Sequence, residues 1–187
     1  EGLHGSHLEA PQVLANAYGV SVKALVAVLR EIAAQIDELE RELDRSFRSH
    51  PDAEIYLSLP GLGDVLGARA LGEFGDDRTR YANPKSRKAY AGTAPITKAS
   101  GTRSVVLARF ARNKRLTDAC RLWAFAALSR SPGARRYYDQ LRARGKTHNQ
   151  ALRQLANRLV GILHVCLERR EFYREEVAWP ELEEAAA

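Results

Sequence analysis

The sequence predicts a mainly α-helical protein in which a long, coiled-coil-like helix precedes a compact helical domain. Three observations predict this fold class. Apolar residues recur at steps of three and four over most of the chain, which is the period of one face of an α-helix. Turn-forming pairs that contain glycine or proline separate these periodic stretches, and only one short interval is β-prone. Hydrophobic residues make up 45% of the 187 positions, which is enough for a packed core.

The chain is expected to have four parts. Residues 1–19 form a lead-in without a steady period, residues 20–50 a coiled-coil arm, residues 51–172 the compact domain, and residues 173–187 an acidic, alanine-rich tail. Methionine is absent, even from the first position, so we expect the chain to be cut or processed from a longer protein.

The arm is expected to be one long helix that follows Ser21 as its N-cap. Its apolar residues alternate steps of three and four, as in a heptad repeat. These seam residues are Val22, Leu25, Leu29, Ile32, Ile36, Leu39 and Leu43. Charged residues occupy many of the remaining positions and form a solvated surface. The apolar seam together with this charged surface predicts self-association through a coiled coil. The alternative is a long amphipathic helix that folds back on its own domain.

The compact domain is expected to open with a helix-hairpin-helix-like element. Two short helical patterns, over about residues 53–59 and 64–74, flank a Gly-apolar-Gly turn at Gly61 and Gly63. Such glycines would allow a tight turn, and the second helix would offer unpaired N–H groups to a phosphate. The alternative is a plain helical turn, because Asp64 stands where the phosphate would approach.

The rest of the domain is expected to contain four helices and one small hairpin. Asn83 and Pro84 should cap a short basic helix that ends at Gly92. Residues 93–103 form a turn-rich loop, with a hairpin around Ser100-Gly101-Thr102. The three later helices are expected over residues 115–129, 133–144 and 147–170, and the last has the apolar face of a core helix.

Positive charge is concentrated in the middle of the chain. Residues 78–146 carry 18 lysines and arginines against two acidic residues, although the whole chain has a net charge of only +6. A folded segment of this kind repels itself unless an anion neutralises it, and nucleic-acid phosphate is the commonest such anion. An anionic membrane surface is the competing explanation, but the segment lacks a basic amphipathic helix with an aromatic face. We therefore expect a nucleic-acid partner, contacted by Lys85, Arg87, Lys88, Lys98, Arg103, Arg109, Arg112, Lys114 and Arg115.

Membrane, cofactor and disulfide functions are not expected. No apolar run approaches the roughly 18 to 20 uncharged residues of a membrane span, so we expect a soluble, cytoplasmic protein. Cys120 and Cys166 lie in helical patterns and have no partner at metal-ligand spacing, which predicts buried thiols. The acidic residues of the arm lie on a solvated surface, and no metal site is expected in this chain.

One loop carries residues suited to nucleophilic chemistry. It presents the hydroxyl of Ser100 between Lys98 and Arg103, and fixed cations can oppose the charge that develops in phosphoryl transfer. Among the nearby hydroxyl groups, only that of Ser100 is followed by a glycine, which leaves room for a bulky phosphodiester. From the residues alone, a Ser-Gly turn in a basic protein is usually only a turn.

Several motifs, taken in their order along the chain, resemble those of a known family. The motifs are Leu59-Pro60-Gly61-Leu62-Gly63, Glu73-Phe74-Gly75-Asp76, Tyr90-Ala91-Gly92-Thr93-Ala94-Pro95, Ser100-Gly101, Asn113-Lys114-Arg115-Leu116, Trp123-Ala124-Phe125-Ala126-Ala127, and Arg144-Gly145-Lys146 followed by Ala151-Leu152. The stretch from Leu57 to about Arg169 resembles the C-terminal transposase domain of the insertion-sequence-110 family, to which Piv-type DNA invertases are similar. The resemblance implies that the serine of the Ser-Gly pair, Ser100 here, is the nucleophile that attacks DNA.

The resemblance also implies partners outside this chain. The family has an N-terminal RuvC-like domain with an acidic, Mg²⁺-binding tetrad, so Mg²⁺ is expected in that domain and no cofactor in this chain. The family is guided by a bridge RNA that pairs with DNA, so part of the basic segment is expected to serve RNA.

The sequence thus leads to one preferred function and two alternatives. The chain is expected to be the catalytic-serine and nucleic-acid-binding part of a transposase or site-specific DNA recombinase, inactive on its own. The first alternative is a non-catalytic DNA- or RNA-binding helix-hairpin-helix module with a dimerising coiled coil. The second, a helical assembly module, would leave the basic segment without a role.

Overall fold

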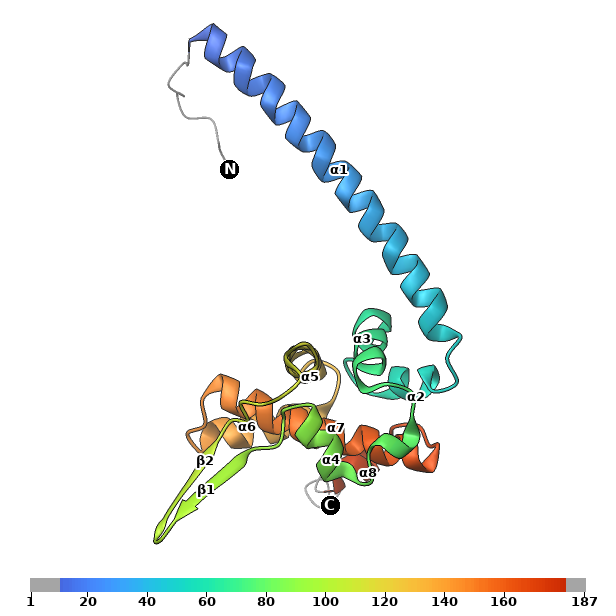
Figure 1. Cartoon of the computed structure of the whole chain (residues 1–187), viewed down its shortest axis with the longest axis vertical. Helices are drawn as coiled ribbons and strands as arrows, with labels where there is room; N and C mark the ends of the chain where they lie inside the picture. The colour runs from blue at the N-terminus through green and yellow to red at the C-terminus, as the bar shows by residue number, and fades with distance from the viewer. Residues whose placement is uncertain (1–10, 181–187) are drawn as a thin grey trace. The chain divides into compact units, whose positions relative to one another are not determined.

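The computed structural model describes residues 11–180, with the side chains of Arg78, Arg103 and Ser104 left out. Helices dominate this part of the chain, which confirms the mainly α-helical prediction. The chain divides into two units between Glu42 and Leu43 (Figure 1). The elements are α1 Gln12–Arg48, α2 Ala53–Ser58, α3 Asp64–Phe74, the 3-10 turn η1 Arg78–Arg80, α4 Pro84–Tyr90, β1 Ile96–Ser100, β2 Arg103–Leu107, α5 Lys114–Ala127, α6 Pro132–Ala143, α7 His148–Arg169 and α8 Glu175–Ala178.

Helix α1 begins earlier than the sequence suggested. Ser21 is not its N-cap but lies within it, where its hydroxyl donates a hydrogen bond to the carbonyl of Ala17 at 3.1 Å. The expectation of an irregular lead-in is therefore wrong for residues 12–19, which are rich in helix-forming alanine, leucine and glutamine. Residues 1–10 of the expected lead-in lie outside the described residues.

The apolar seam of α1 is exposed within the first unit. From Val22 to Leu39, every seam side chain is at least 48% exposed. The last turn of α1 belongs to the compact unit instead, where the Phe47 ring is buried and packs edge-on against Tyr56, with ring centroids 6.5 Å apart.

Helix α1 also meets the length and composition of a membrane span, with a mean hydropathy of 1.5 over its best 18-residue window. Any 18-residue stretch of α1 contains at least one charged residue, so the expectation that no uncharged run approaches this length is not contradicted. The alanine and valine residues between the seam positions, around Lys23, raise the hydropathy of the window. Core helices of soluble proteins pass the same test, so the finding is weak support for a membrane location.

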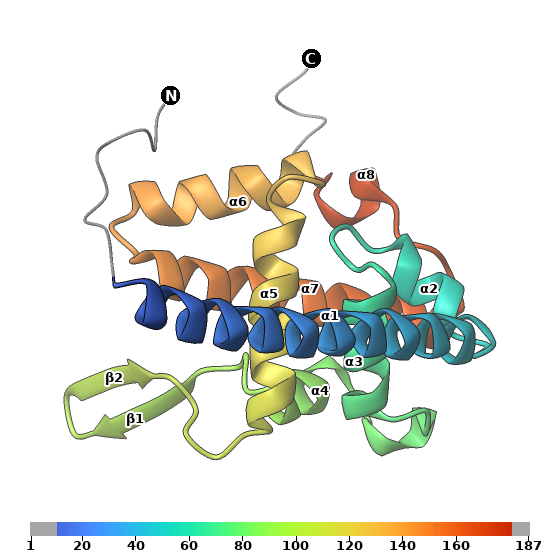
Figure 2. The same ribbon diagram turned by 90° about the horizontal axis from the view of Figure 1, so that it is seen from above.

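The compact unit is built around α7, which packs against α4, α5, α6 and α2. Figure 2 shows α5 crossing α7 and α6 running beside it. Thr147 and Gln150 form a capping box at the start of α7, and Arg170 ends the helix in the left-handed conformation. Along the helix, the core residues are Ala151, Leu152, Leu155, Ala156, Leu159, Val160, Leu163, Cys166 and Leu167.

The Gly-apolar-Gly turn packs against α5. The Gly61 backbone has a φ of +83°, and a Cβ placed there would lie 2.6 Å from the backbone nitrogen of Ala127. Beside it, the buried Trp123 ring donates from Nε1 to the carbonyl of Pro60 at 2.9 Å. The turn is therefore a packing element, in which Gly61 allows two backbones to approach closely.

The segment that follows α7 is part of the fold up to residue 180. The Trp179 ring is buried over Gly133, where a Cβ would lie 2.2 Å from Trp179 Cγ. Glu175 accepts hydrogen bonds from the Ser131 hydroxyl at 2.8 Å and from the Gly133 N–H at 2.7 Å. The expectation of a tail from residue 173 is thus wrong for residues 173–180, because Trp179 provides an apolar anchor that composition alone does not reveal.

The cysteines lie in the core, as the sequence predicted. Cys120 and Cys166 are both buried and free. Burial raises the pKa of Cys120 to about 12 and also raises that of Cys166, so both remain protonated thiols at neutral pH.

Candidate nucleic-acid interface

Ser100 lies at the tip of a protruding two-stranded hairpin. Strands β1 and β2 pair antiparallel, with Ile96 opposite Leu107 at the base and Ser100 opposite Arg103 at the tip (Figure 1). Gly101 is the first of the two turn residues and has the positive φ, +56°, that such a turn requires. The expected hairpin is therefore present, although the residues that precede Ser100 form a strand and not a loop. Ser100 is exposed, so its hydroxyl is accessible to a large substrate.

The base of the hairpin is fixed to the helical core. Thr93 is buried, and its hydroxyl lies 3.3 Å from both the carbonyl of Lys88 and Oδ1 of Asn157. At Gly92, φ is +70° and a Cβ would lie 2.6 Å from the Thr117 hydroxyl. The Thr117 hydroxyl in turn donates to the carbonyl of Ala91 at 2.8 Å. The hairpin thus extends from an anchored loop.

The segment after the hairpin is held by Asn113. Its side chain accepts a hydrogen bond from the Leu116 N–H, which caps α5, and donates to Oε2 of Glu73 at 2.6 Å. The Arg112 guanidinium donates to the carbonyl of Arg109. These contacts connect α3, the loop and α5, and they fix the backbone that carries the basic residues 109–115.

A basic groove of about 500 Å³ lies beside this segment, between α5 and the start of α7. Four cationic side chains line it, against one carboxylate, that of Asp118. Asp118 is itself paired with Arg69 and Arg121, each at 3.3 Å. We call this the α5–α7 groove, and its lining residues are Thr93, Arg112, Lys114, Thr117, Asp118, Arg121, Asn149, Arg153 and Ala156.

A second groove, of about 420 Å³, lies between the base of the hairpin and α7. It shares Thr93 and Arg153 with the first groove, and Lys146 adds a further cation. Amide side chains of Gln150, Gln154 and Asn157 line it too. Together the two grooves surround the root of the hairpin with positive charge and hydrogen-bond donors, which is a surface suited to phosphate.

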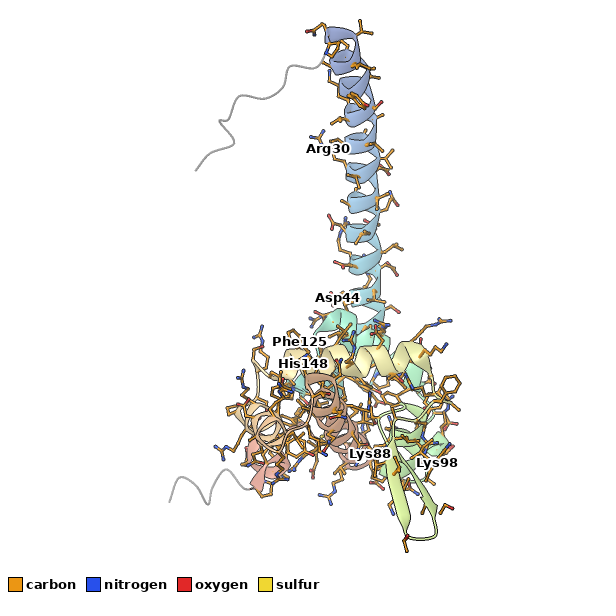
Figure 3. The ribbon with its side chains drawn as sticks, turned by 90° about the vertical axis from the view of Figure 1, so that its left-hand side faces the viewer. Arg30, Asp44, Lys88, Lys98, Phe125 and His148 are labelled. Carbon is orange, nitrogen blue, oxygen red and sulfur yellow. The ribbon has the colours of Figure 1, made fainter. Side chains whose placement is uncertain are left out.

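The structure brings only some of the predicted basic residues to this surface. Arg112 and Lys114 line the α5–α7 groove. Lys98 is exposed on the hairpin, as Figure 3 shows, two residues from Ser100 and hence on the same face of the strand.

Arg115 is exposed and lies 3.9 Å from Glu73, whereas Arg109 is only half-exposed. Arg103 is the register partner of Ser100.

The three basic residues of α4 do not share one surface. Lys85 is exposed, but Lys88 is half-buried against α7, where a Cβ on Gly161 would lie 2.6 Å from its Cε. Burial and the nearby Arg158 lower the pKa of Lys88. Neither residue lines the two grooves, so α4 does not extend them.

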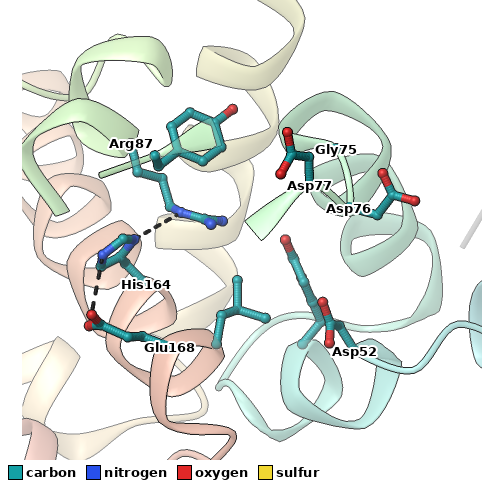
Figure 4. Close-up of a pocket in the computed structure, with 10 residues that line it drawn as sticks. Asp52, Gly75, Asp76, Asp77, Arg87, His164 and Glu168 are labelled. Carbon is teal, nitrogen blue, oxygen red and sulfur yellow. Dashed lines mark hydrogen bonds and ion pairs between the residues drawn. The ribbon is translucent and has the colours of Figure 1, made fainter. Parts of the chain in front are cut away.

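Arg87 is buried, which corrects its assignment to the nucleic-acid surface. Its side chain reaches into a cavity of about 200 Å³ whose rim carries Asp52, Asp76, Asp77 and Glu168 (Figure 4).

The Arg87 guanidinium lies over the rings of Phe74 and Tyr81 and donates from Nε to Nδ1 of His164 at 3.2 Å. The helical period places this residue inward, between the partly exposed Ser86 and Lys88 of α4. Arg87 is therefore a core cation that joins α4 to α7.

The lowered pKa of His164 predicts that the stability of this core depends on pH. Burial and the charge of Arg87 lower the pKa of His164, whereas an unfolded chain would protonate it at the ordinary value. Below pH 6.5 the unfolded state binds more protons, so the free energy of unfolding should fall as the pH falls from 7.5 to 5.5. His164→Gln should weaken this dependence, as measured by urea unfolding at several pH values. Equal pH dependence in parent and variant would contradict the assignment.

Of the two glycines in the expected phosphate-binding turn, Gly61 serves packing, whereas Gly63 lies in open space. Gly61 faces α5, as described above, and Gly63 lies at the start of α3 with no neighbouring atom within 4 Å of the position that a Cβ would take. The carboxylate of Asp64 occupies this helix start and pairs with Arg48 at 2.7 Å. A carboxylate there opposes phosphate binding, so the geometry gives no support to a DNA contact at this turn.

Comparison with known proteins identifies the domain. Residues 53–139, from α2 through most of α6 and including the hairpin, match the transposase family described as IS116/IS110/IS902. The chain contains a transposase domain of this family. Over 172 residues, 92% of the chain, it is 46% identical to a Streptomyces coelicolor protein named as a candidate transposase for the mini-circle IS117.

Two further relatives of the transposase domain come from insertion elements. The chain is 36% identical over 160 residues to an uncharacterized 43.6 kDa protein of IS110 from Streptomyces coelicolor. It is 35% identical over 153 residues to an uncharacterized 42 kDa protein of IS900 from Mycobacterium paratuberculosis. These matches cover 84% and 81% of this chain. The chain spans only 42%, 39% and 38% of the three relatives, in the order given.

Several groove residues of the transposase domain were not predicted from the sequence to bind nucleic acid. They are Arg121, Lys146, Asn149, Gln150, Arg153, Gln154 and Asn157. They come from α5, from the turn before α7 and from α7. In the sequence they cannot be distinguished from the polar residues on the solvent-exposed faces of ordinary helices. Spacing could have found one pair, since Asn149 and Arg153 are four residues apart and share a helix face. Among residues 11–180, no cluster of three or more His, Cys, Asp or Glu side chains could hold a metal ion.

Proposed function

We propose that this chain is the catalytic-serine and nucleic-acid-binding part of a DNA transposase or site-specific recombinase. One observation carries the proposal: an exposed serine hydroxyl stands at the tip of a protruding hairpin whose root is flanked by two basic grooves. The transposase family of the domain supports DNA as the substrate. Because the chain spans about two fifths of its relatives, we propose that the fragment is inactive alone.

In the proposed reaction, Oγ of Ser100 attacks a DNA phosphodiester. An Oγ–P bond forms as the serine hydroxyl releases its proton, the bond from phosphorus to one deoxyribose oxygen breaks, and that oxygen takes up a proton and leaves as a hydroxyl. A later attack by a DNA hydroxyl on the serine phosphodiester reverses the chemistry and joins new strands. Lys98, on the same strand face as Ser100, would oppose the negative charge that develops on the phosphate oxygens.

The grooves would hold the DNA on which the hairpin acts. Phosphates seated near Arg112, Lys114, Arg121 and Arg153 would fix the position of the backbone but not read its sequence. We propose that part of this basic surface serves a guide RNA, since the same charge suits both nucleic acids. Mg²⁺ would belong to the RuvC-like domain that the family resemblance implies, outside this chain.

Neutralising the α5–α7 groove tests the binding half of the proposal. Replacing both Arg121 and Arg153 with glutamine should weaken duplex binding and reduce the slope of log K against log salt by about 0.9 for each lost phosphate contact. Fluorescence anisotropy at several salt concentrations measures this slope. Arg30→Gln, an exposed arginine of α1, is the control and should leave the slope unchanged. An unchanged slope in the double variant would show that phosphate does not occupy the groove.

We further propose that α1 joins copies of the protein through a coiled coil. The support is the exposed heptad seam, since seven apolar side chains at this spacing form one continuous stripe. The double substitution Leu29→Glu and Ile36→Glu should lower the oligomeric mass in analytical ultracentrifugation, because charge in such a seam is costly. Ala27→Glu with Ala34→Glu adds the same charges away from the seam and should keep the mass of the parent. Equal masses in seam variant and parent would remove the coiled coil.

The alternative of a non-catalytic nucleic-acid-binding module makes a different prediction for Ser100. In that case the basic grooves would bind as proposed, and the serine hydroxyl would be dispensable. Removing this hydroxyl in the full-length protein therefore separates the two functions.

A further inference from the structure

An aromatic pair borders the α5–α7 groove and has no part in the proposed chemistry. Phe125 lies on α5 and is 59% exposed, and His148 is the first residue of α7 and is exposed as well. Their rings meet edge to face, with centroids 6.4 Å apart and planes at 83° (Figure 3). A phenylalanine this exposed keeps apolar ring surface in water unless a partner covers it.

The pair is held in place by α6. The Tyr138 hydroxyl and Nδ1 of His148 are 2.7 Å apart, and the two rings lie edge to face with centroids 5.9 Å apart. The His148 ring therefore contacts one aromatic ring from α5 and one from α6. Because its orientation is fixed before any ligand arrives, a flat ligand that stacks here would order few side chains on binding.

The groove and the aromatic pair are continuous on both of their helices. Arg121 lines the groove and lies one turn before Phe125 on the same face of α5. Asn149 lines the groove and directly follows His148 on α7. A strand whose phosphates lie near Arg121 and Arg153 would thus bring its next bases to Phe125 and His148.

We infer that the α5–α7 groove and this aromatic pair bind an unpaired stretch of nucleic acid, with a base stacked on Phe125. The inference rests on the proposed nucleic-acid function and adds that this part of the surface takes a single strand. Cationic grooves that run onto exposed aromatic rings bind single strands because phosphates pair with the cations while free base faces stack on the rings. In a duplex the base faces are covered by their neighbours, so duplex DNA could use the cations but not the rings.

The test compares single-stranded and duplex probes on the whole 187-residue chain. Fluorescein-labelled 16-nucleotide dA, the same length of rA, and a 16-base-pair duplex of mixed sequence are titrated in 0.1 M salt and followed by anisotropy. Phe125→Ala should weaken single-strand binding by about 5- to 100-fold and change duplex binding by less than about twofold. Comparing dA with rA shows which sugar the site prefers, because stacking is available to both.

Three variants control for structure and for surface apolarity. Alanine is a good helix former at an exposed helical position, so Phe125→Ala should keep the circular dichroism and melting temperature of the parent. Phe125→Trp should retain single-strand binding, whereas Phe125→Leu, which is apolar but not aromatic, should lose it. Phe172→Ala removes an equally exposed ring, 61% exposed, outside the groove and should change neither affinity.

The outcomes separate this inference from the proposed function. Equal loss on single strand and duplex, or no loss with Phe125→Ala, would overturn the stacking inference while leaving nucleic-acid binding in place. A chain that binds none of the three probes would overturn both.

Discussion

Ser100→Ala is expected to abolish DNA strand exchange by the full-length protein, with a loss of about 10⁴-fold or more. This is the order of effect expected when a covalent nucleophile is removed, because no other group can form the intermediate. The same substitution should leave folding and binding nearly unchanged. Ser100 is exposed at the hairpin tip, and within residues 11–180 each strand of the hairpin packs chiefly against the other strand.

Thr97→Ala is the matched control for this experiment. Thr97 is an exposed hydroxyl residue on the same strand, opposite Val106, and successive residues of a strand point to opposite faces. Thr97 therefore faces away from the side that carries Lys98 and Ser100. Strand exchange is measured as conversion of a supercoiled substrate, and binding as anisotropy on the same DNA. Near-parental strand exchange by Ser100→Ala would mean that the hydroxyl is dispensable and that the chemistry belongs to another domain.

Gly61→Ala is expected to destabilise the compact unit by about 3 kcal/mol or to prevent folding. A Cβ at this position would lie 2.6 Å from the nitrogen of Ala127 and 2.9 Å from the carbonyl carbon of Ala126. Both neighbours are backbone atoms of α5, which cannot rotate away, so the helix itself would have to shift. The φ of +83° adds the strain of a side chain in the left-handed region.

Gly72→Ala is the control for this prediction. Gly72 lies within α3 and has no atom within 4 Å of the position that a Cβ would take. The Gly72→Ala protein should therefore be slightly more stable than the parent, because alanine favours the helix. Urea unfolding followed by circular dichroism measures both variants. Equal midpoints for Gly61→Ala and the parent would show that the turn does not pack on α5 as described. The alternative that this turn binds phosphate would then have to be tested.

Local signals in the sequence were enough to place most helices. Asn83 with Pro84 predicted the start of α4, and the capping box of Thr147 with Gln150 marks the start of α7. These signals act within one turn of helix and need no tertiary information. Ser21 was wrongly predicted to be an N-cap because such local signals are ambiguous. A serine suited to an N-cap also fits within a helix when its hydroxyl bonds to the preceding turn.

The arrangement of the candidate site could be predicted only in part. Ser100 and its hairpin were found because a Ser-Gly turn and a β-prone run are adjacent in sequence. The burial of Arg87 was not found, because it depends on His164, which is 77 positions away. The grooves were missed for a similar reason, since Arg121 and Arg153 meet only after α5 packs on α7. Sequence charge predicts that a surface is basic, whereas packing decides which cations share it.

The covalent intermediate gives the most direct test of the central proposal. The full-length protein is reacted with its DNA, denatured and digested with nuclease and trypsin, and the peptide that retains a nucleotide is sequenced by mass spectrometry. Cleavage after Lys98 and Arg103 releases residues 99–103, and we expect a nucleotide on Ser100 of this peptide. A nucleotide on any other residue, or strand exchange without a protein–DNA adduct, would contradict the assignment of Ser100 as the nucleophile.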